Sequence, residues 1–272
     1  MAARPMADDV IRSASNPLVH KLRSLKEKGD RELCLLEGPT LVEEALAAGI
    51  EVVEAALSSR FARTHRGRRL MGALSRARLL DERLISSLSE VETSQGVLAL
   101  ARRPRFEEQA FFPDEPLIVV AVGLQNPGNL GGLLRTAEAA GATGAYLAEG
   151  TADSFSWKAL RGSMGSAFRL PHLRHAAAGE VLASLRARSI RIIATVSGSG
   201  GVRYETADLA KPAALFFGNE GSGLPEDIEA GADLRVSIPL LGPVESLNVG
   251  VAAGVILFEA ARQRRRGDRL RK

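Results

Sequence analysis

The chain has 272 residues, more than the usual about 100–200 residues of one domain, so we expect two domains with sizeable cores. Hydrophobic residues make up 45% and charged residues 25% of the sequence, which excludes a disordered chain, and a net charge of +4 is too small to identify a partner. No apolar run reaches the about 18–20 residues that cross a bilayer, and the first residues lack the apolar core of a secretory signal. We therefore expect a cytoplasmic protein that does not bind membranes.

The N-terminal part of the sequence alternates between helical and strand patterns. Leu18, Leu22 and Leu25 recur at helical spacing after Asn16-Pro17. Apolar runs predict further strands at residues 33–36, 52–57, 77–80 and 96–101. Helices are predicted at residues 40–48, with Thr40 as the cap, and 81–90, with a basic helical stretch between the second and third strands. These patterns predict a small α/β domain over residues 11–102.

Residues 103–116 contain three prolines, many charges and no regular period, which is typical of a linker. Beyond them, the β-branched run at 117–122 is suited to a central strand of a parallel sheet. More strands are predicted at residues 145–147, 190–196, 214–217 and 234–238. Helices are predicted between and after them, at residues 130–140, 158–162, 179–187 and 246–264. We expect a second α/β domain with a mainly parallel sheet over 117–265, followed by a basic tail at 266–272.

Basic residues cluster in two places. The stretch 60–78 has no carboxylate, and 262–272 holds seven basic residues against Asp268 alone. The first stretch contains seven arginines: Arg60, Arg63, Arg66, Arg68, Arg69, Arg76 and Arg78. Such clusters are typical of phosphate binding, although a solvated basic face explains them equally well.

The loop after the strand at 117–122 reads Asn126-Pro127-Gly128-Asn129 and leads into a helix. Ligands of parallel α/β sheets collect at such strand ends. Asn129 is suited to cap the helix, which would place Arg135 about two turns, or roughly 9 Å, further along it. The simpler interpretation is a capped helix with an exposed arginine.

A second strand-end loop is Gly218-Asn219-Glu220-Gly221-Ser222-Gly223. Three glycines let a ligand approach the backbone, but the lysine of a phosphate-binding loop is missing. Glu220 would repel a phosphate, so a neutral or cationic ligand with hydroxyl groups fits better. A tight structural turn is the alternative.

A third loop follows the strand at 234–238 and ends in Ser246-Leu247-Asn248. Ser246 is suited to cap the last helix, whereas Asn248 has little helical reason to be there. This helix begins with small residues, which favour a dimer interface or a close helix crossing: Gly250, Ala252, Ala253 and Gly254.

Taken in order, these three loops resemble the SpoU (TrmH-type) 2′-O-ribose RNA methyltransferases of the SPOUT class. The family motifs correspond to Asn129 with Arg135-Thr136, to Gly218–Gly223, and to Ile238-Pro239 with Ser246–Val249. The front segments IRSASNPLVHKLRSL and LLEGPTLVEEALAAG are similar to the RNA-binding domain of the same family. Gly250 departs from the serine or alanine that is common there.

The resemblance implies a trefoil-knotted sheet domain, S-adenosylmethionine as the methyl donor, and a homodimer that completes the site. It implies cofactor contacts at Thr195, Gly218, Ile238 and Leu247. No metal is expected. The substrate would be structured RNA, with ribosomal RNA favoured over transfer RNA. The seven arginines would bind its phosphates.

The catalytic set implied by the resemblance centres on Arg135. Because a guanidinium has a pKa above ~12, we expect Arg135 to orient the ribose and stabilise its developing charge. Asn129 and Ser246 would orient Arg135 or the ribose, while Glu220 and Asn248 would shape the surrounding loops.

The sequence also disfavours two other classes of protein. A non-catalytic RNA-binding protein with this fold would have no need for the five polar motif residues. A nucleotide-dependent oxidoreductase is excluded because no glycine fingerprint follows a first strand.

Overall fold

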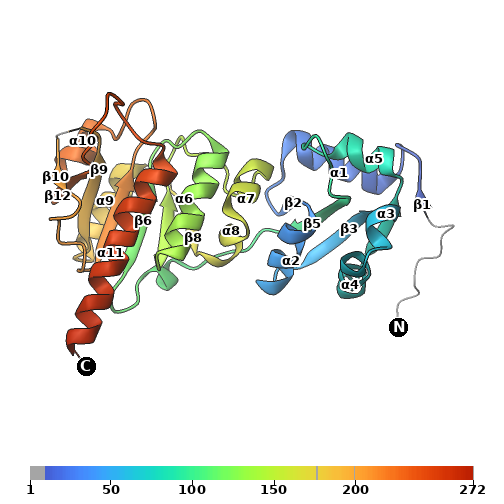
Figure 1. The fold of residues 1–272 in the computed structure, drawn as a ribbon, viewed down its shortest axis with the longest axis horizontal. Coiled ribbons are helices and arrows are strands. Elements are labelled where there is room, and N and C mark those ends of the chain that lie inside the picture. The colour runs from blue at the N-terminus through green and yellow to red at the C-terminus, as the bar shows by residue number, and fades with distance from the viewer. Residues whose placement is uncertain (1–9, 176, 199, 272) are drawn as a thin grey trace. The chain divides into compact units, whose positions relative to one another are not determined.

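The computed structural model describes residues 10–175, 177–198 and 200–271, without the side chains of 267–271. The chain divides into two compact units. The first consists of the residues up to 104 together with 155–168, and the second of 105–154 and the residues from 169 onward. Figure 1 shows both units as sheets covered by helices.

The first unit contains a five-stranded mixed sheet in the order β1-β4-β3-β5-β2. Its strands are β1 (Val10–Ile11), β2 (Leu33–Glu37), β3 (Val52–Ser58), β4 (Ala77–Leu80) and β5 (Val97–Arg102). Strands β1, β4 and β3 are parallel, and β5 runs antiparallel to its neighbours β3 and β2. The helices are α1 (Pro17–Lys28), α2 (Pro39–Ala47), α3 (Ser59–Ala62), α4 (His65–Ala73) and α5 (Glu82–Leu88).

Apolar side chains of α1 and α5 bury one face of this sheet, where Leu22 and Ile85 pack with Leu98. Helices α2, α3 and α4 lie on the other face (Figure 1). The predicted cap at Thr40 is wrong: α2 begins at Pro39, and Gly38, with φ of 89°, precedes it as the cap. Proline suits the first helical position because its φ is already helical and its missing N–H needs no partner there.

The second unit is built on a seven-stranded sheet in the order β10-β12-β9-β11-β6-β7-β8, in which every pair is parallel. Its strands are β6 (Leu117–Ala121), β7 (Gly144–Leu147), β8 (His172–Arg174), β9 (Arg191–Val196), β10 (Val202–Arg203), β11 (Ala213–Phe217) and β12 (Leu234–Ser237). Its helices are α6 (Pro127–Ala139), α9 (Ala178–Ala187), α10 (Glu226–Ala230) and α11 (Val249–Arg271). The short edge strands β8 and β10 were not predicted from the sequence.

Both faces of the parallel sheet are buried. Val120 and Phe216 pack with α9 and α10 in one core, so the alternate residues Val119 and Leu215 point to the other face. Helices α6 and α11 lie on that face and pack against each other (Figure 1). The trefoil knot stays a prediction.

The segment 103–116, predicted as a linker, holds the 3₁₀ helix η2 (Glu108–Phe111). Phe111 is fully buried and meets the Tyr146 ring edge-on, with 5.0 Å between ring centroids. A Cβ at Gly144 would overlap the Phe111 ring, so a glycine is required there. The segment is therefore anchored in the core of the second unit.

Helices α7 (Trp157–Ser163) and α8 (Ser166–Arg169) follow β7, yet residues 155–168 pack with the first unit. Trp157 Nε1 donates a hydrogen bond of 2.7 Å to Glu37 Oε2 at the end of β2. The Arg103 guanidinium lies 5.4 Å from the centre of the Phe155 ring. Nothing local in the sequence indicates this excursion, because its partners lie far away along the chain.

None of the helices in the described part of the chain is long and apolar enough to cross a membrane. Helix α11 extends past the predicted end of 264 to Arg271, so it includes most of the basic tail. Lys272 and the tail side chains from 267 on lie outside what the structure describes.

Candidate active site

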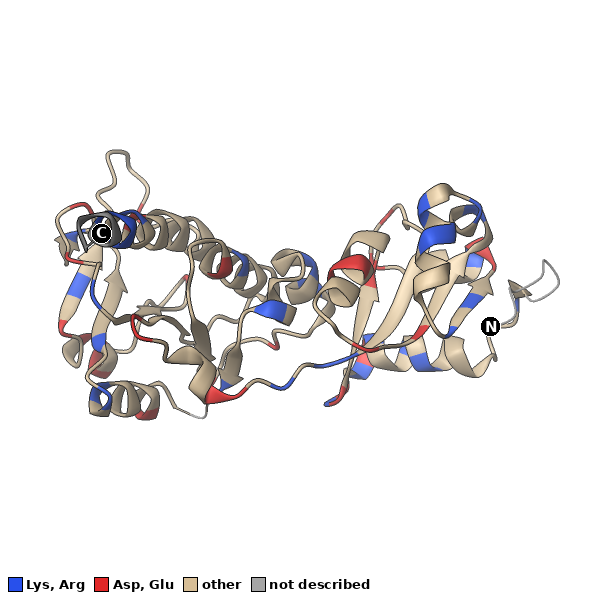
Figure 2. Ribbon diagram, turned by 90° about the horizontal axis from the view of Figure 1, so that it is seen from below, with Lys and Arg blue, Asp and Glu red and all other residues tan. Residues whose placement is uncertain are grey.

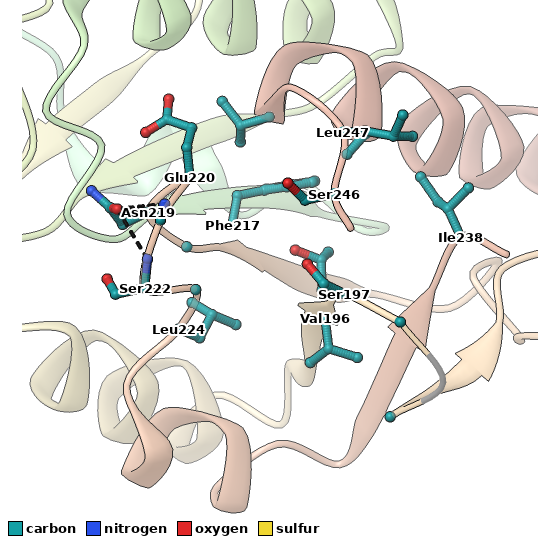
Figure 3. Close-up of a pocket in the computed structure, with 18 of the residues that line it drawn as sticks. Val196, Ser197, Phe217, Asn219, Glu220, Ser222, Leu224, Ile238, Ser246 and Leu247 are labelled. Atoms are coloured by element: carbon teal, nitrogen blue, oxygen red, sulfur yellow. Dashed lines mark hydrogen bonds between the residues drawn. The ribbon is translucent and has the colours of Figure 1, made fainter. Parts of the chain in front are cut away.

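A cavity of about 390 Å³ opens at the carboxyl edge of the parallel sheet (Figure 3). It lies where β9, β11 and β12 end and where α11 begins, which is the position at which α/β sheets bind ligands. The four residues predicted to contact a cofactor all line it: Thr195, Gly218, Ile238 and Leu247. Glu220 and Ser246 line it as well.

Apolar and polar groups both line the cavity. The apolar side chains include Ile238, Leu240, Leu247 and Ile256, and five of the lining residues are glycines. Serine hydroxyls and the carboxylates of Glu220 and Glu229 supply polar groups. The two carboxylates favour a neutral or cationic ligand over a phosphate, and none of the described residues that line the cavity is a lysine or arginine.

The loop after β11 is held by Asn219, a residue that the sequence analysis did not single out. Its Oδ1 accepts hydrogen bonds from the N–H groups of Gly221 (2.8 Å) and Ser222 (3.3 Å), and its Nδ2 donates to Gly123 O (2.8 Å). A Cβ at Gly218 would overlap the carbonyl of Gly223. An asparagine ahead of Gly and Ser is a local turn signal that could have been found from the sequence.

Asn129 joins the three motif loops. Its Nδ2 donates to Glu220 Oε1, and its Oδ1 accepts from Asn248 Nδ2 at 3.0 Å. It does not cap the helix as predicted: Asn126 Oδ1 accepts from the N–H groups of Gly128 and Asn129, and Pro127 is the first helical residue. The side chain of Asn129 is therefore available for bridging.

The predicted cap at Ser246 is also wrong, because α11 begins at Val249. Asn248 precedes it and accepts from Gly250 N–H at 2.9 Å through Oδ1, while its carbonyl accepts from Ala252 N–H at 2.9 Å. Asn248 is therefore the cap of α11, a role that was not predicted from the sequence. Ser246 is exposed and lines the cavity (Figure 3).

The small residues at the start of α11 serve a crossing with α6 inside one chain. A Cβ at Gly250 would lie 3.9 Å from the carbonyl carbon of Gly132, and one at Gly254 the same distance from Thr136 Cγ2. Ala253 is fully buried. Gly250, where the family commonly has serine or alanine, thus lies where the backbones of α6 and α11 come close together.

Arg135 lies on α6, six residues beyond Asn129, and is exposed. It is not among the residues that line the cavity. Within the described part of the chain, no hydrogen bond or ion pair occupies its guanidinium. The structure therefore brings together every predicted catalytic and cofactor residue except Arg135, whose side chain is available to another molecule.

The seven arginines of the stretch 60–78 lie on or beside α3, α4 and β4 in the first unit, and Figure 2 shows basic positions on several elements of that unit. Six are exposed, but Arg66 pairs with Glu43, with Nη2 2.6 Å from Oε2 and Nε 3.1 Å from Oε1. Hydrogen bonds from Arg66 hold the pKa of the Glu43 carboxyl below its ordinary value. Arg69 also pairs with Glu43, at 3.0 Å, so these two arginines are partly engaged within the protein.

Two basic residues of the C-terminal cluster are engaged as well. Arg262 pairs with Glu259 at 2.6 Å. Arg264 donates to four carbonyl oxygens, including Glu115 O at 2.9 Å, and burial lowers the pKa of its guanidinium. Arg264 therefore links α11 to the segments that precede β6 and β11. In the described residues, no group of three His, Cys, Asp or Glu side chains is placed to hold a metal ion.

An all-parallel sheet with a glycine-rich cavity at its carboxyl edge defines a small-molecule-binding α/β protein, here joined to a mixed-sheet unit. The chain belongs to the SpoU rRNA methylase family, whose family model matches residues 116–258. Residues 16–99 match the MRM3-like substrate binding domain. The expected family and the α/β organisation of both parts are thereby confirmed.

Individual relatives match more than nine-tenths of this chain. The 23S rRNA (guanosine(2553)-2′-O)-methyltransferase RlmP of Bacillus subtilis (strain 168) is 35% identical over 91% of this chain and 97% of its own length. A crystal structure of an RNA 2′-O ribose methyltransferase, 36% identical, matches with a TM-score of 0.82 over 93% of this chain and 98% of that one. An AdoMet-bound rRNA methyltransferase from Sinorhizobium meliloti, 32% identical, matches with a TM-score of 0.80 over 93% and 98%.

Proposed function

We propose that this protein transfers a methyl group from S-adenosylmethionine to a ribose 2′-hydroxyl of structured RNA. The observation that carries this proposal is one cavity lined by the loops after β9, β11 and β12, in which Glu220 is bound by Asn129, the residue that also hydrogen-bonds Asn248. Ribosomal RNA is the favoured substrate because the relatives include a 23S rRNA methyltransferase similar over nearly its whole length. Transfer RNA is the alternative substrate class, and we propose that the enzyme acts in the cytoplasm.

The cavity suits S-adenosylmethionine. A volume of about 390 Å³ lies within the roughly 300–1,000 Å³ of small-molecule sites. Ile238 and Leu247 offer an apolar surface to an adenine ring, and the backbone around Gly218 offers hydrogen-bonding groups to the ribose and amino acid parts. Glu220 and Glu229 suit a ligand that carries positive charge. When bound, this cofactor supplies an electrophilic methyl group.

The residues of the chain act on the RNA by positioning and charge stabilisation. Arg135 has an unoccupied guanidinium, which can hold a phosphate and the ribose oxygen and stabilise negative charge developing on that oxygen. Since a guanidinium keeps its protons, the hydroxyl proton passes to phosphate or water. Asn129 and Asn248 fix the Glu220 loop, and Ser246, which lines the cavity, reaches the ribose.

We propose that the working form is a homodimer. Val251 and Phe258 are 54% and 48% exposed, and their seven-residue spacing puts them on one face of α11. Residues 250–254 of α11 lie beside 132–136 of α6, so this apolar face is at the level of Arg135. Pairing of two copies through α11 supports a site in which Arg135 of one copy serves the cavity of the other.

Substitution of Arg135 tests the catalytic assignment. We expect Arg135→Ala to lower the rate of methyl transfer by about 10²–10³-fold, the typical loss for one charge-stabilising donor, with unchanged affinity for S-adenosylmethionine. Arg135→Lys should recover little, because an ammonium lacks the planar fork. Arg188→Ala is the control, since Arg188 pairs with Glu108 at the opposite edge of the sheet. Wild-type rates for Arg135→Ala with normal RNA binding would refute the assignment.

A further inference from the structure

A second, smaller cavity of about 160 Å³ lies within the first unit. It is lined by the junction of β2 and α2, the loop before β5, and α7. Its volume is well below the roughly 300–1,000 Å³ of sites for whole cofactors, so it suits one planar group. The lining residues that matter here are Glu37, Thr40, Gln95, Trp157 and Arg161.

The cavity is built around the single tryptophan of the chain. Trp157 Nε1 donates to Glu37 Oε2 at 2.7 Å, which fixes the orientation of the indole. Glu37 also accepts from Ser89 Oγ and from the N–H of Glu90 at 3.2 Å. The Arg161 guanidinium lies 5.5 Å from the centre of the indole ring. The indole is therefore held in place by Glu37, and the Arg161 guanidinium lies over its ring.

Two polar side chains of the cavity are available for further hydrogen bonds. Among the hydrogen bonds of the described residues, neither the Gln95 amide nor the Arg161 guanidinium has a partner within the chain. The Gln95 amide can hydrogen-bond the edge of a planar heterocycle whose face stacks on the indole and the Arg161 guanidinium. The Glu37 carboxylate disfavours a phosphate inside the cavity and leaves a neutral ring as the better occupant.

The cavity adjoins the arginine stretch 60–78. Arg66, on α4, donates from Nη2 to Thr40 Oγ1 at 2.8 Å, and Thr40 lines the cavity. The exposed arginines Arg63 and Arg68 lie in the same short segment as Arg66. A nucleic acid whose phosphates contact this segment would thus have a base within reach of the cavity.

We propose that this cavity receives one unstacked nucleobase of the RNA substrate and so contributes to substrate selection away from the methyl-transfer site. The proposal rests on the proposed function, since it takes RNA as the substrate. Trp157 and Arg161 stack on the base, and Gln95 reads its edge. Structured RNA is recognised in this way where loops or bulges splay a base out.

Intrinsic fluorescence tests the proposal directly, because all tryptophan emission comes from Trp157. The full-length protein is titrated with single-stranded RNA hexamers of each base, with free N-acetyltryptophanamide as the optical control. We expect saturable quenching that is strongest for one base. Arg161→Ala should raise the Kd of that titration about tenfold, in line with stacking contributions of about 1–3 kcal/mol per base.

Lys158→Ala removes the same charge from the same helix outside the cavity lining and should leave the Kd unchanged. Absent quenching, or equal weakening by Arg161→Ala and Lys158→Ala, would overturn the proposal. Calorimetric titration of S-adenosylmethionine separates the two claims. Failure of that cofactor to bind refutes the proposed function, whereas normal cofactor binding without quenching refutes only the base-binding cavity.

Discussion

Asn248 Nδ2 lies 3.0 Å from Asn129 Oδ1, although 119 positions separate these residues in the sequence. Asn248 also caps α11, and Asn129 also donates a hydrogen bond to Glu220 in the third loop. The loops after β6, β11 and β12 are therefore fixed to one another by side-chain amides. A change in any one of them is transmitted to the cavity wall.

The two roles of Asn248 can be separated by substitution. Asn248→Ala removes the cap and should cost about 0.5–2 kcal/mol of unfolding free energy. Asn248→Asp keeps an oxygen for the Gly250 N–H but removes the donor to Asn129, so we expect near-normal stability and a threefold to tenfold weaker affinity for S-adenosylmethionine. Chemical denaturation and calorimetry measure the two effects. Equal cofactor affinity in wild type and Asn248→Asp would show that the bridge is dispensable.

Gly218→Ala should damage the cofactor site more than any helix glycine would. The added Cβ overlaps the Gly223 carbonyl, so the loop must shift, and we expect at least tenfold weaker cofactor binding with about 1–3 kcal/mol lower stability. Gly179→Ala on α9 is the control, because a Cβ there has no atom within 4 Å. If both variants bound S-adenosylmethionine like wild type, the cavity after β11 would not be the cofactor site.

The arginine stretch is tested by the salt dependence of RNA binding. Replacing exposed Arg63, Arg68 and Arg76 together by alanine should weaken binding and reduce the slope of log K against log salt by about 2–3, since each lost phosphate contact removes roughly 0.7–0.9. Filter binding over a salt series gives the slope. Arg188→Ala serves as the control, and an unchanged slope in the triple variant would assign the RNA contacts elsewhere.

If two copies pair through α11, a charge on the exposed face of this helix should prevent dimerisation. Phe258→Glu places a charge on the exposed apolar face and should convert the dimer to monomers, because a buried carboxylate without a partner is strongly unfavourable. Val202→Glu is the matched control, with a residue 43% exposed on β10. Light scattering after size-exclusion chromatography gives the mass. A monomeric wild type, or a dimeric Phe258→Glu protein, would be incompatible with this interface.

The strand-end motifs could be predicted because their chemistry is local: glycines, asparagines and an arginine follow apolar runs at fixed spacing. Helix starts were less predictable. Prolines follow the caps Asn126 and Gly38 and begin α6 and α2, so the expected caps Asn129 and Thr40 lie inside these helices. At α11, Asn248 accepts from the Gly250 N–H and caps the helix in place of Ser246. The packing of residues 155–168 with the first unit was not predictable, since the bond from Trp157 to Glu37 spans 120 positions.

The most direct test is the position of the methyl group on RNA after reaction with the purified protein and S-adenosylmethionine. Ribosomal RNA from cells that lack the gene is the substrate, and mass spectrometry of the digested product identifies the nucleoside. A 2′-O-methylnucleoside at one site is predicted, together with resistance of that bond to alkaline cleavage and no reaction on RNA carrying a 2′-deoxynucleotide there. A methyl group on a base, or full transfer to the 2′-deoxy substrate, would contradict 2′-O-methylation.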